Sequence, residues 1–276
     1  MDPSEEREIE ERTPPSSEVI HGVIYEEGMT ELEKPTPALA WSGLGAGLAM
    51  GFSFLVTALL HSHLPHDAKW APLIYALGYP IGFVIVILGQ QQLFTENTLT
   101  VTMPLFSGKR VLGGVMRVWG VVLATNVVGA VLFALALAKL DVVDAETYAS
   151  LIKVAEEAHA LTFAKAVVKG IFAGWLIAMV VWLLPHAQTA HVAVIFLLTW
   201  IIGAAHFPHI VAGTVDGMFL VLTGHHSLAK FFGDFFVPTL IGNIIGGTIL
   251  VAAINHLQAR AGKKDEADEP EGIIIA

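Results

Sequence analysis

Two short polar stretches interrupt long apolar sequence, and they hold the residues with the most obvious chemistry. Residues 89–97 read Gly-Gln-Gln-Gln-Leu-Phe-Thr-Glu-Asn, and residues 203–209 read Gly-Ala-Ala-His-Phe-Pro-His. Ionisable residues inside apolar segments are costly, so these stretches are the first candidates for a functional site. Glu96 admits two roles: a solute gate, or a cap or salt bridge at the start of the following helix.

The two histidines of the second stretch admit a metal-binding interpretation. His206 and His209 are three residues apart, but Pro208 prevents ordinary helical geometry between them. No third ligand has an obvious spacing, and cysteine is absent from the chain. We therefore expect no metal at this pair, and an intramembrane metalloenzyme is a minor alternative.

Two lysines, Lys165 and Lys169, lie four residues apart and share one helix face. Long basic side chains near a helix end commonly reach back to the membrane interface. The alternative is an electropositive lining that attracts anions. Lys169 lies deeper in the apolar sequence, so we expect a specific partner for it.

The composition indicates an integral membrane protein. Of 276 residues, 54% are hydrophobic and 14% charged, with a mean hydropathy of +0.65, which excludes a disordered chain. A net charge of −10 gives nucleic-acid binding no support.

Charge divides the chain into three segments. Residues 1–37 hold eleven acidic and three basic residues, and residues 258–276 hold five and three, so residues 38–257 are neutral overall. No apolar core of a secretory signal is visible in the first thirty residues. We expect an acidic cytoplasmic N-terminal segment, without ordered structure up to about residue 25, a transmembrane domain over 38–257 and a polar cytoplasmic C-terminal tail.

Six apolar stretches predict an all-α membrane protein with six transmembrane helices in two inverted three-helix repeats. They are residues 38–60, 70–106, 111–138, 161–184, 190–222 and 235–257. The second and fifth are too long and too broken for single spans of about 20 residues. Breaks at matching positions of two halves are typical of transporters whose site is built from discontinuous helices. The half-helix N-termini at such breaks offer free N–H groups and partial positive charge, which suit an anion.

The flanking bases predict the orientation. Nine bases lie on the side of the N-terminus and four on the other side, which places both termini in the cytoplasm. The nine are Arg7, Arg12, Lys34, Lys109, Arg110, Arg117, Arg260, Lys263 and Lys264, and the four are Lys69, Lys139, Lys153 and Lys230.

Three motifs in order along the chain resemble the formate/nitrite transporter family. They are Leu-Phe-Thr at residues 93–95, Phe-Pro-His at residues 207–209 and Gly-Asn-Ile-Ile-Gly-Gly at residues 242–247. The resemblance covers roughly residues 30–257. The chain departs from the family pattern at Pro208, where many members have Glu, and at Gly174, where many have Asn.

The resemblance implies an aquaporin-like bundle, assembled as a homopentamer with one pore in each protomer. It places Thr95 and His209 at the pore centre and maps the flanking constrictions onto Leu93, Phe94 and Phe207. Apolar constrictions exclude bulk water, while a hydroxyl and an imidazole can exchange a proton or a hydrogen bond with a weak acid. The family also implies that the segment before the first span can plug the inner mouth.

We therefore predict a transporter of the inner or plasma membrane rather than an enzyme. It would carry a small monovalent anion of a weak acid, such as formate or nitrite, with proton involvement and pH modulation by the central His209. Its substrate pathway would be lined by Leu93, Phe94, Thr95, Glu96, Lys165, Lys169, His206, Phe207 and His209, with no cofactor. A channel for water or a small neutral solute is the main alternative, because fold does not fix substrate.

Overall fold

Apolar helices make up the body of the protein. The computed structural model describes residue 2 and residues 15–65 and 67–258, and every regular element within them is a helix. Five segments of that part are long and apolar enough to cross a membrane: Thr36–His63, Ala71–Leu88, Leu112–Lys139, Phe163–Ala204 and Leu228–Gln258. A shorter apolar helix, Ala212–Leu222, completes the set. The predicted all-α membrane fold is confirmed.

Three passages are continuous helices: α3 (Thr36–His63), α8 (Leu112–Lys139) and α10 (Phe163–Ala187). Small residues let the helices approach closely, as membrane helices often require. A Cβ on Gly47 of α3 would collide with the Asn126 carbonyl of α8. A Cβ on Gly174 of α10 would likewise collide with the Asn243 carbonyl of the last passage. No side chain fits at position 174, so the departure from the family pattern there is a packing requirement.

Two passages are broken, as the sequence predicts. The first comprises α4 (Ala71–Tyr75), η1 (Ala76–Gly78) and α5 (Pro80–Leu88), then a loop, then α6 (Phe94–Thr100) and α7 (Met103–Phe106). The second comprises η2 (Gln188–Ala190) and α11 (His191–Ala204), then a loop, then α12 (Ala212–Leu222). The half-helix α6 begins at Phe94, inside the polar stretch 89–97, so Thr95 lies on a helix.

The last passage combines α13 (Leu228–Lys230), the π-helical η3 (Phe231–Phe236), α14 (Val237–Ile244) and the π-helical η4 (Ile245–Ala253). The amphipathic helix α9 (Ala145–Ala158) connects α8 to α10. Asp144 caps α9, because its side chain accepts a hydrogen bond from the Thr147 N–H at 2.7 Å. This exposed hydrogen bond also lowers the pKa of Asp144.

The N-terminal segment contains an ordered helix, α2 (Ser17–Glu33), so the expectation of disorder up to residue 25 is wrong for residues 17–25. Ser16 caps it, and Ile20 and Ile24 are buried among apolar residues of α6, α10 and η4. Arg117 of α8 fixes its far end by donating hydrogen bonds to the carbonyls of Leu32 (2.8 Å) and Lys34 (2.9 Å). The prediction of disorder was based on the acidic composition and overlooked the apolar face through which this helix packs on the bundle. Residues 1, 3–14 and 259–276 lie outside the described residues, and with them most of the predicted C-terminal tail.

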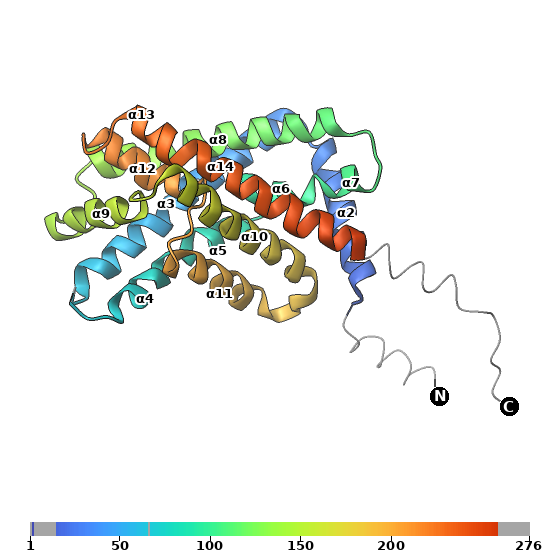
Figure 1. The fold of residues 1–276 in the computed structure, drawn as a ribbon, viewed down its shortest axis with the longest axis horizontal. Helices are drawn as coiled ribbons and strands as arrows, with labels where there is room; N and C mark the ends of the chain where they lie inside the picture. Colours follow the sequence, from blue (N-terminus) through green and yellow to red (C-terminus); the bar gives the residue numbers. More distant parts are fainter. Residues whose placement is uncertain (1, 3–14, 66, 259–276) are drawn as a thin grey trace.

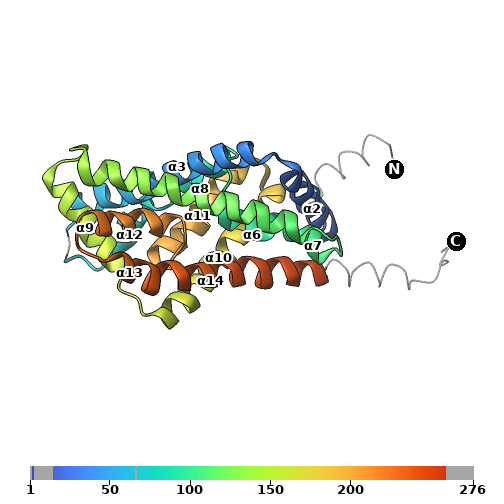
Figure 2. The same ribbon diagram turned by 90° about the horizontal axis from the view of Figure 1, so that it is seen from above.

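The helices define two ends of the molecule. In Figures 1 and 2, α2 and α7 lie at one end and α9 and α13 at the other. We call these the α2 end and the α9 end. The described chain starts and finishes at the α2 end, where the His21 and His256 rings are in contact at 3.1 Å between Nε2 and Nδ1.

Candidate functional site

The two breaks have the same local construction. Two residues after each preceding helix ends, a non-glycine residue has a positive φ: Gln90 (50°) after α5 and His206 (50°) after α11. The next N–H reaches back to a carbonyl five residues earlier, Gln91 to Val86 and Phe207 to Ile202, both at 3.0 Å. This is a common helix termination, and it needs no proline. Pro208 follows the second helix end instead of causing it.

One asparagine braces each break. The Asn126 side chain accepts from the Phe94 N–H (2.9 Å) and donates to the carbonyls of Gln92 (2.9 Å) and Gly43 (2.8 Å).

The second break repeats this arrangement. The Asn243 side chain accepts from the Ile210 N–H (2.9 Å) and donates to the carbonyls of Pro208 (3.0 Å) and Gly170 (2.9 Å). The equivalent partners come from the first, second and third passages of each half, as two repeats require. Both asparagines are fully buried. Asn126 takes the first N–H of α6 and Asn243 takes an N–H two residues before α12, so neither of these groups is free for an anion.

Thr95 and His209 meet at the centre of the bundle. Their side chains lie 2.7 Å apart between Oγ1 and Nε2, and both residues are almost fully buried. The Ala212 N–H donates to His209 Nδ1 at 3.2 Å. In the neutral ring, Nδ1 is therefore the acceptor and Nε2 carries the proton, so Nε2–H donates to the threonine oxygen. The Thr95 hydroxyl proton is left for another acceptor.

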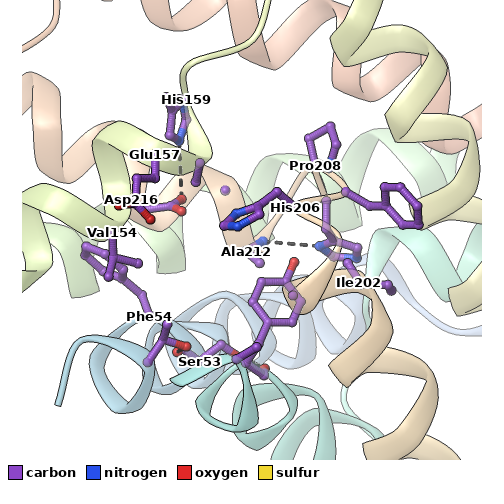
Figure 3. A pocket seen from close by; sticks show the side chains of 18 of the residues that line it. Ser53, Phe54, Val154, Glu157, His159, Ile202, His206, Pro208, Ala212 and Asp216 are labelled. Carbon is purple, nitrogen blue, oxygen red and sulfur yellow. Dashed lines mark hydrogen bonds and ion pairs between the residues drawn. The ribbon is translucent and has the colours of Figure 1, made fainter. Parts of the chain in front are cut away.

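A cavity approaches this contact from each end of the molecule. The cavity at the α9 end, about 70 Å³, is lined by His209, Phe207 and His206 among others (Figure 3). The cavity at the α2 end, about 600 Å³, is lined by Leu93 and Glu96 among others. Thr95 borders neither cavity, so the Thr95–His209 contact lies at the barrier between them.

The predicted constriction residues differ in their surroundings. Leu93 and Phe207 border the cavities on opposite sides of the barrier. Phe207 stacks on Phe172 with ring centroids 5.3 Å apart. Phe94 points its edge at Trp119, with centroids 5.7 Å apart, and borders neither cavity.

Acidic side chains of α2 lie in the same cavity as Glu96. Glu27 and Glu31 line the same cavity, and Glu31 pairs with Lys34 at 2.6 Å. Burial, and next the charge of Glu31, raise the pKa of Glu27, while Lys34 opposes the shift. The α2 end of the pathway therefore carries more acidic than basic groups.

The two lysines have separate surroundings. The Lys169 ammonium donates to the carbonyls of Ala205 (3.0 Å) and His206 (3.2 Å) at the end of α11, where a cation complements the helix dipole. This is the specific partner that its depth predicts. Lys165 is exposed and borders neither cavity.

His206 and His209 are not arranged to bind one metal ion together. Both ring nitrogens of His209 are engaged, by Thr95 and by the Ala212 N–H. Among the described residues, no group of three or more His, Asp or Glu side chains is arranged to hold a metal ion.

Sequence reasoning missed two features of the site. Asn126 stands alone in an apolar span, and the signal that could have found it is its match to Asn243 in the second half. His159 and Asp216 form a buried contact in the α9-end cavity, at 3.4 Å between Nε2 and Oδ1. No local motif joins these two residues, which are far apart in sequence.

An inverted-repeat bundle with a Thr–His contact between two cavities defines a membrane transport protein, and comparisons with known proteins agree. The family model described as Formate/nitrite transporter matches residues 18–257. The chain belongs to the formate/nitrite transporter family, and it is a multi-pass membrane protein.

Individual relatives extend over most of the chain. Inner membrane protein YfdC of Escherichia coli strain K12 is 38% identical over 253 residues, which cover 91% of this chain and 81% of that protein. The formate channel BtFdhC of Bacillus thuringiensis is 26% identical over 83% of this chain and 90% of its own length. A solved pentameric formate channel with formate bound has a TM-score of 0.68 at 20% identity, covering 81% of this chain and 97% of that one.

Proposed function

We propose that this protein transports a small monovalent anion of a weak acid, of the size of formate or nitrite, through a pathway within each protomer. The carrying observation is the Thr95–His209 contact at the barrier between two cavities. The solved channel with formate bound and the formate channel of Bacillus thuringiensis, both similar to this chain, support this substrate class.

The barrier can act on such a solute through hydrogen bonds. Leu93 and Phe207 exclude bulk water on the two sides, so a passing solute needs a replacement for its hydration. The Thr95 hydroxyl is the donor that the neutral His209 ring leaves available.

His209 also makes the pathway sensitive to pH in this proposal. Only the neutral ring keeps the hydrogen bond from the Ala212 N–H, because a proton on Nδ1 would face that N–H directly. Flux is expected to rise as pH falls, since more substrate is protonated, and the rise ends where His209 takes up a proton.

The test is flux of formate and nitrite into proteoliposomes between about pH 5 and 8, for wild type and His209→Phe side by side. We expect wild-type flux above protein-free liposomes, and lower flux with an altered pH profile in the variant. No flux of either ion through inserted, folded wild type would reject the proposed function. Swelling rates in an osmotic gradient identify a water or neutral-solute channel in that event.

Assembly and placement belong to the same proposal. We infer a homopentamer with a pore in each protomer, in the inner or plasma membrane, with the α2 end cytoplasmic. The similar solved formate channel is pentameric, and the Escherichia coli relative is an inner membrane protein. The bases at the α2 end support the orientation.

Helix α2 covers the cavity of the cytoplasmic end in this proposal. Its residues Glu27 and Glu31 line that cavity, and Gly28 packs so closely on the Thr100 carbonyl that a Cβ would collide. Deleting residues 1–25 removes half of the face of α2 that packs on the bundle, and deleting residues 1–35 removes all of that face. Flux is expected to increase stepwise, and unchanged flux after the longer deletion would exclude a plug.

A further inference from the structure

Two tyrosines line the α9-end cavity, and their hydroxyls differ in what they bind. The Tyr75 hydroxyl donates to Glu157 Oε2 at 3.3 Å. The Tyr79 hydroxyl has no hydrogen-bond partner in the part of the chain that the structure describes, and it is not one of the buried polar atoms that the surrounding protein closes off. Tyr79 is also partly exposed, so its free hydroxyl is open to the cavity that the residue lines.

The other polar side chains near the barrier are committed to the protein. Thr57 donates to the Ser53 carbonyl at 2.7 Å, and the Ser53 hydroxyl donates to the Tyr79 carbonyl at 2.5 Å. Both ring nitrogens of His209 are engaged. His206 is exposed and keeps its contact with solvent. The Tyr79 hydroxyl is therefore a donor that a solute can use without breaking a hydrogen bond of the protein.

The two carboxylates of the cavity have other partners. Glu157 accepts the Tyr75 hydroxyl. Asp216 lies 3.4 Å from His159 between Oδ1 and Nε2 (Figure 3). Among the described residues, neither carboxylate accepts a hydrogen bond from Tyr79. An anion needs a donor in a cavity that holds two acidic side chains, and the free Tyr79 hydroxyl supplies one.

Packing on both sides fixes the Tyr79 ring. Tyr79 lies between η1 and α5, where its carbonyl accepts from Ser53 of α3, and the same serine oxygen accepts from the Gly82 N–H at 3.1 Å. On the side of α11, a Cβ on Gly203 would lie 2.7 Å from Tyr79 Cβ, so glycine is required for this close approach. A tyrosine side chain has two χ angles, so a fixed ring also fixes the position of the hydroxyl oxygen.

Aromatic contacts connect Tyr79 to the barrier. The Tyr79 and Phe83 rings lie 5.4 Å apart between centroids, and the Phe83 and His209 rings lie 4.9 Å apart. Tyr79 and His209 line the same cavity of about 70 Å³. In so small a space, a solute that contacts the Tyr79 hydroxyl lies close to His209, on the α9 side of the Thr95–His209 contact.

We propose that the Tyr79 hydroxyl binds the solute on the α9 side of the barrier, an inference that rests on the proposed function. The O–H group donates a hydrogen bond to an oxygen of the carboxylate or of nitrite, and no covalent bond forms or breaks. A hydrogen bond to an anion is stronger than one between neutral groups, and it replaces part of the hydration that the solute loses. A hydroxyl also accepts hydrogen bonds, so Tyr79 can hold the protonated acid as well. The Thr95 hydroxyl is the next donor along the pathway.

The dependence of flux on formate concentration tests the hydroxyl. Tyr79→Phe removes one oxygen and keeps the ring. Tyr148→Phe is the matched control, because Tyr148 is also partly exposed, borders neither cavity and packs on Phe219 with ring centroids 5.6 Å apart. We expect the half-saturating formate concentration to rise about tenfold in Tyr79→Phe, the equivalent of one hydrogen bond to a charged group, with a smaller change in maximal flux. Equal half-saturating concentrations in the two variants overturn the inference.

A second readout is independent of flux. The chain has 4 tyrosines, so labelling tyrosine with ¹³C at Cζ gives few NMR signals in lipid nanodiscs, and the signal lost in Tyr79→Phe identifies Tyr79. We expect formate to shift the Tyr79 signal saturably and to leave that of Tyr148 in place. A Tyr79 signal that formate does not move overturns the inference. Absent wild-type flux rejects the proposed function instead, and the formate titration then decides alone whether Tyr79 binds the anion.

Discussion

One backbone N–H decides what the central imidazole can do. The Ala212 N–H occupies His209 Nδ1 at 3.2 Å, and Nε2 is committed to Thr95 at 2.7 Å. A histidine with both nitrogens assigned is a fixed hydrogen-bond donor and a poor source of protons. Reading His209 only as the residue type that titrates near neutral pH overlooks this fixed tautomer.

The Thr95 hydroxyl is expected to matter for flux more than for stability. Thr95→Val removes the free O–H at the barrier and leaves the His209 N–H facing a methyl group, so formate flux should fall about tenfold, the equivalent of one hydrogen bond. Thr199→Val is the control, because Thr199 is equally buried but its hydroxyl donates to carbonyls of its own helix, Ile195 at 2.7 Å and Phe196 at 3.4 Å. Equal flux in the two variants would remove Thr95 from the pathway. Liposome flux measures both.

Glu27 is expected to make the docking of α2 dependent on pH. Burial and the neighbouring Glu31 raise its pKa in the folded protein, so the ionised form opposes docking at neutral pH. Docking should strengthen as pH falls through the raised pKa. Glu27→Gln should show the stronger docking already at neutral pH, with Glu26→Gln as control, because Glu27 lines the α2-end cavity and Glu26 does not. Hydrogen exchange of residues 20–33, corrected for intrinsic rates, measures this; an exchange rate in Glu27→Gln equal to the control contradicts it.

The residues of the site were only partly readable from sequence. Thr95 and His209 could be predicted because they sit in polar stretches and match family motifs. Asn126 was missed, because for one asparagine in an apolar span the match to Asn243 in the second half is the signal available in sequence. His159 and Asp216 are brought together only by the packing of α9 on α12.

Among the helices, the two asparagine braces explain why the breaks are stable in a membrane. Each brace satisfies one N–H and one carbonyl of the break that no helix can pair, and it also donates to a carbonyl inside α3 or α10. Lipid offers no water to replace these hydrogen bonds. In the sequence, residues 89–97 form a polar interruption, whereas in the structure the second half-helix begins within it, at Phe94. Polar residues 95–97 resemble a loop in sequence, but the Asn126 cap and burial hold them in a helix.

Removing either brace is expected to destabilise the bundle strongly. Asn126→Leu and Asn243→Leu each leave two buried backbone groups of the break unpaired, at about 1 kcal/mol or more for each group, so a loss of about 2 kcal/mol or more is expected. Asn255→Leu is the control, because in the described part of the chain the Asn255 side chain bonds to the Val251 carbonyl alone, at 3.0 Å. Thermal unfolding in detergent compares the three variants. Melting temperatures that match the control would show that the breaks do not depend on the asparagines.

For the molecule as a whole, the absence of cysteine permits a direct test of orientation. Lys109→Cys lies at the α2 end and Lys139→Cys at the α9 end, because α8 begins after the first position and ends at the second. With the α2 end cytoplasmic, a membrane-impermeant maleimide should label Lys139→Cys but not Lys109→Cys on intact cells or spheroplasts. Both should react after lysis. The reverse pattern would invert the proposed topology.

The matching braces also show where the two halves differ. Leu93 and His209 occupy equivalent positions, each between a carbonyl and an N–H held by the same asparagine. The backbone contacts of the two breaks are therefore nearly symmetric. The difference between the two directions of transport depends heavily on which half carries the imidazole. A double exchange, Leu93→His with His209→Leu, would move the imidazole to the other half and leave the backbone contacts of both breaks in place. Any preference for flux in one direction that the central residue sets should then reverse.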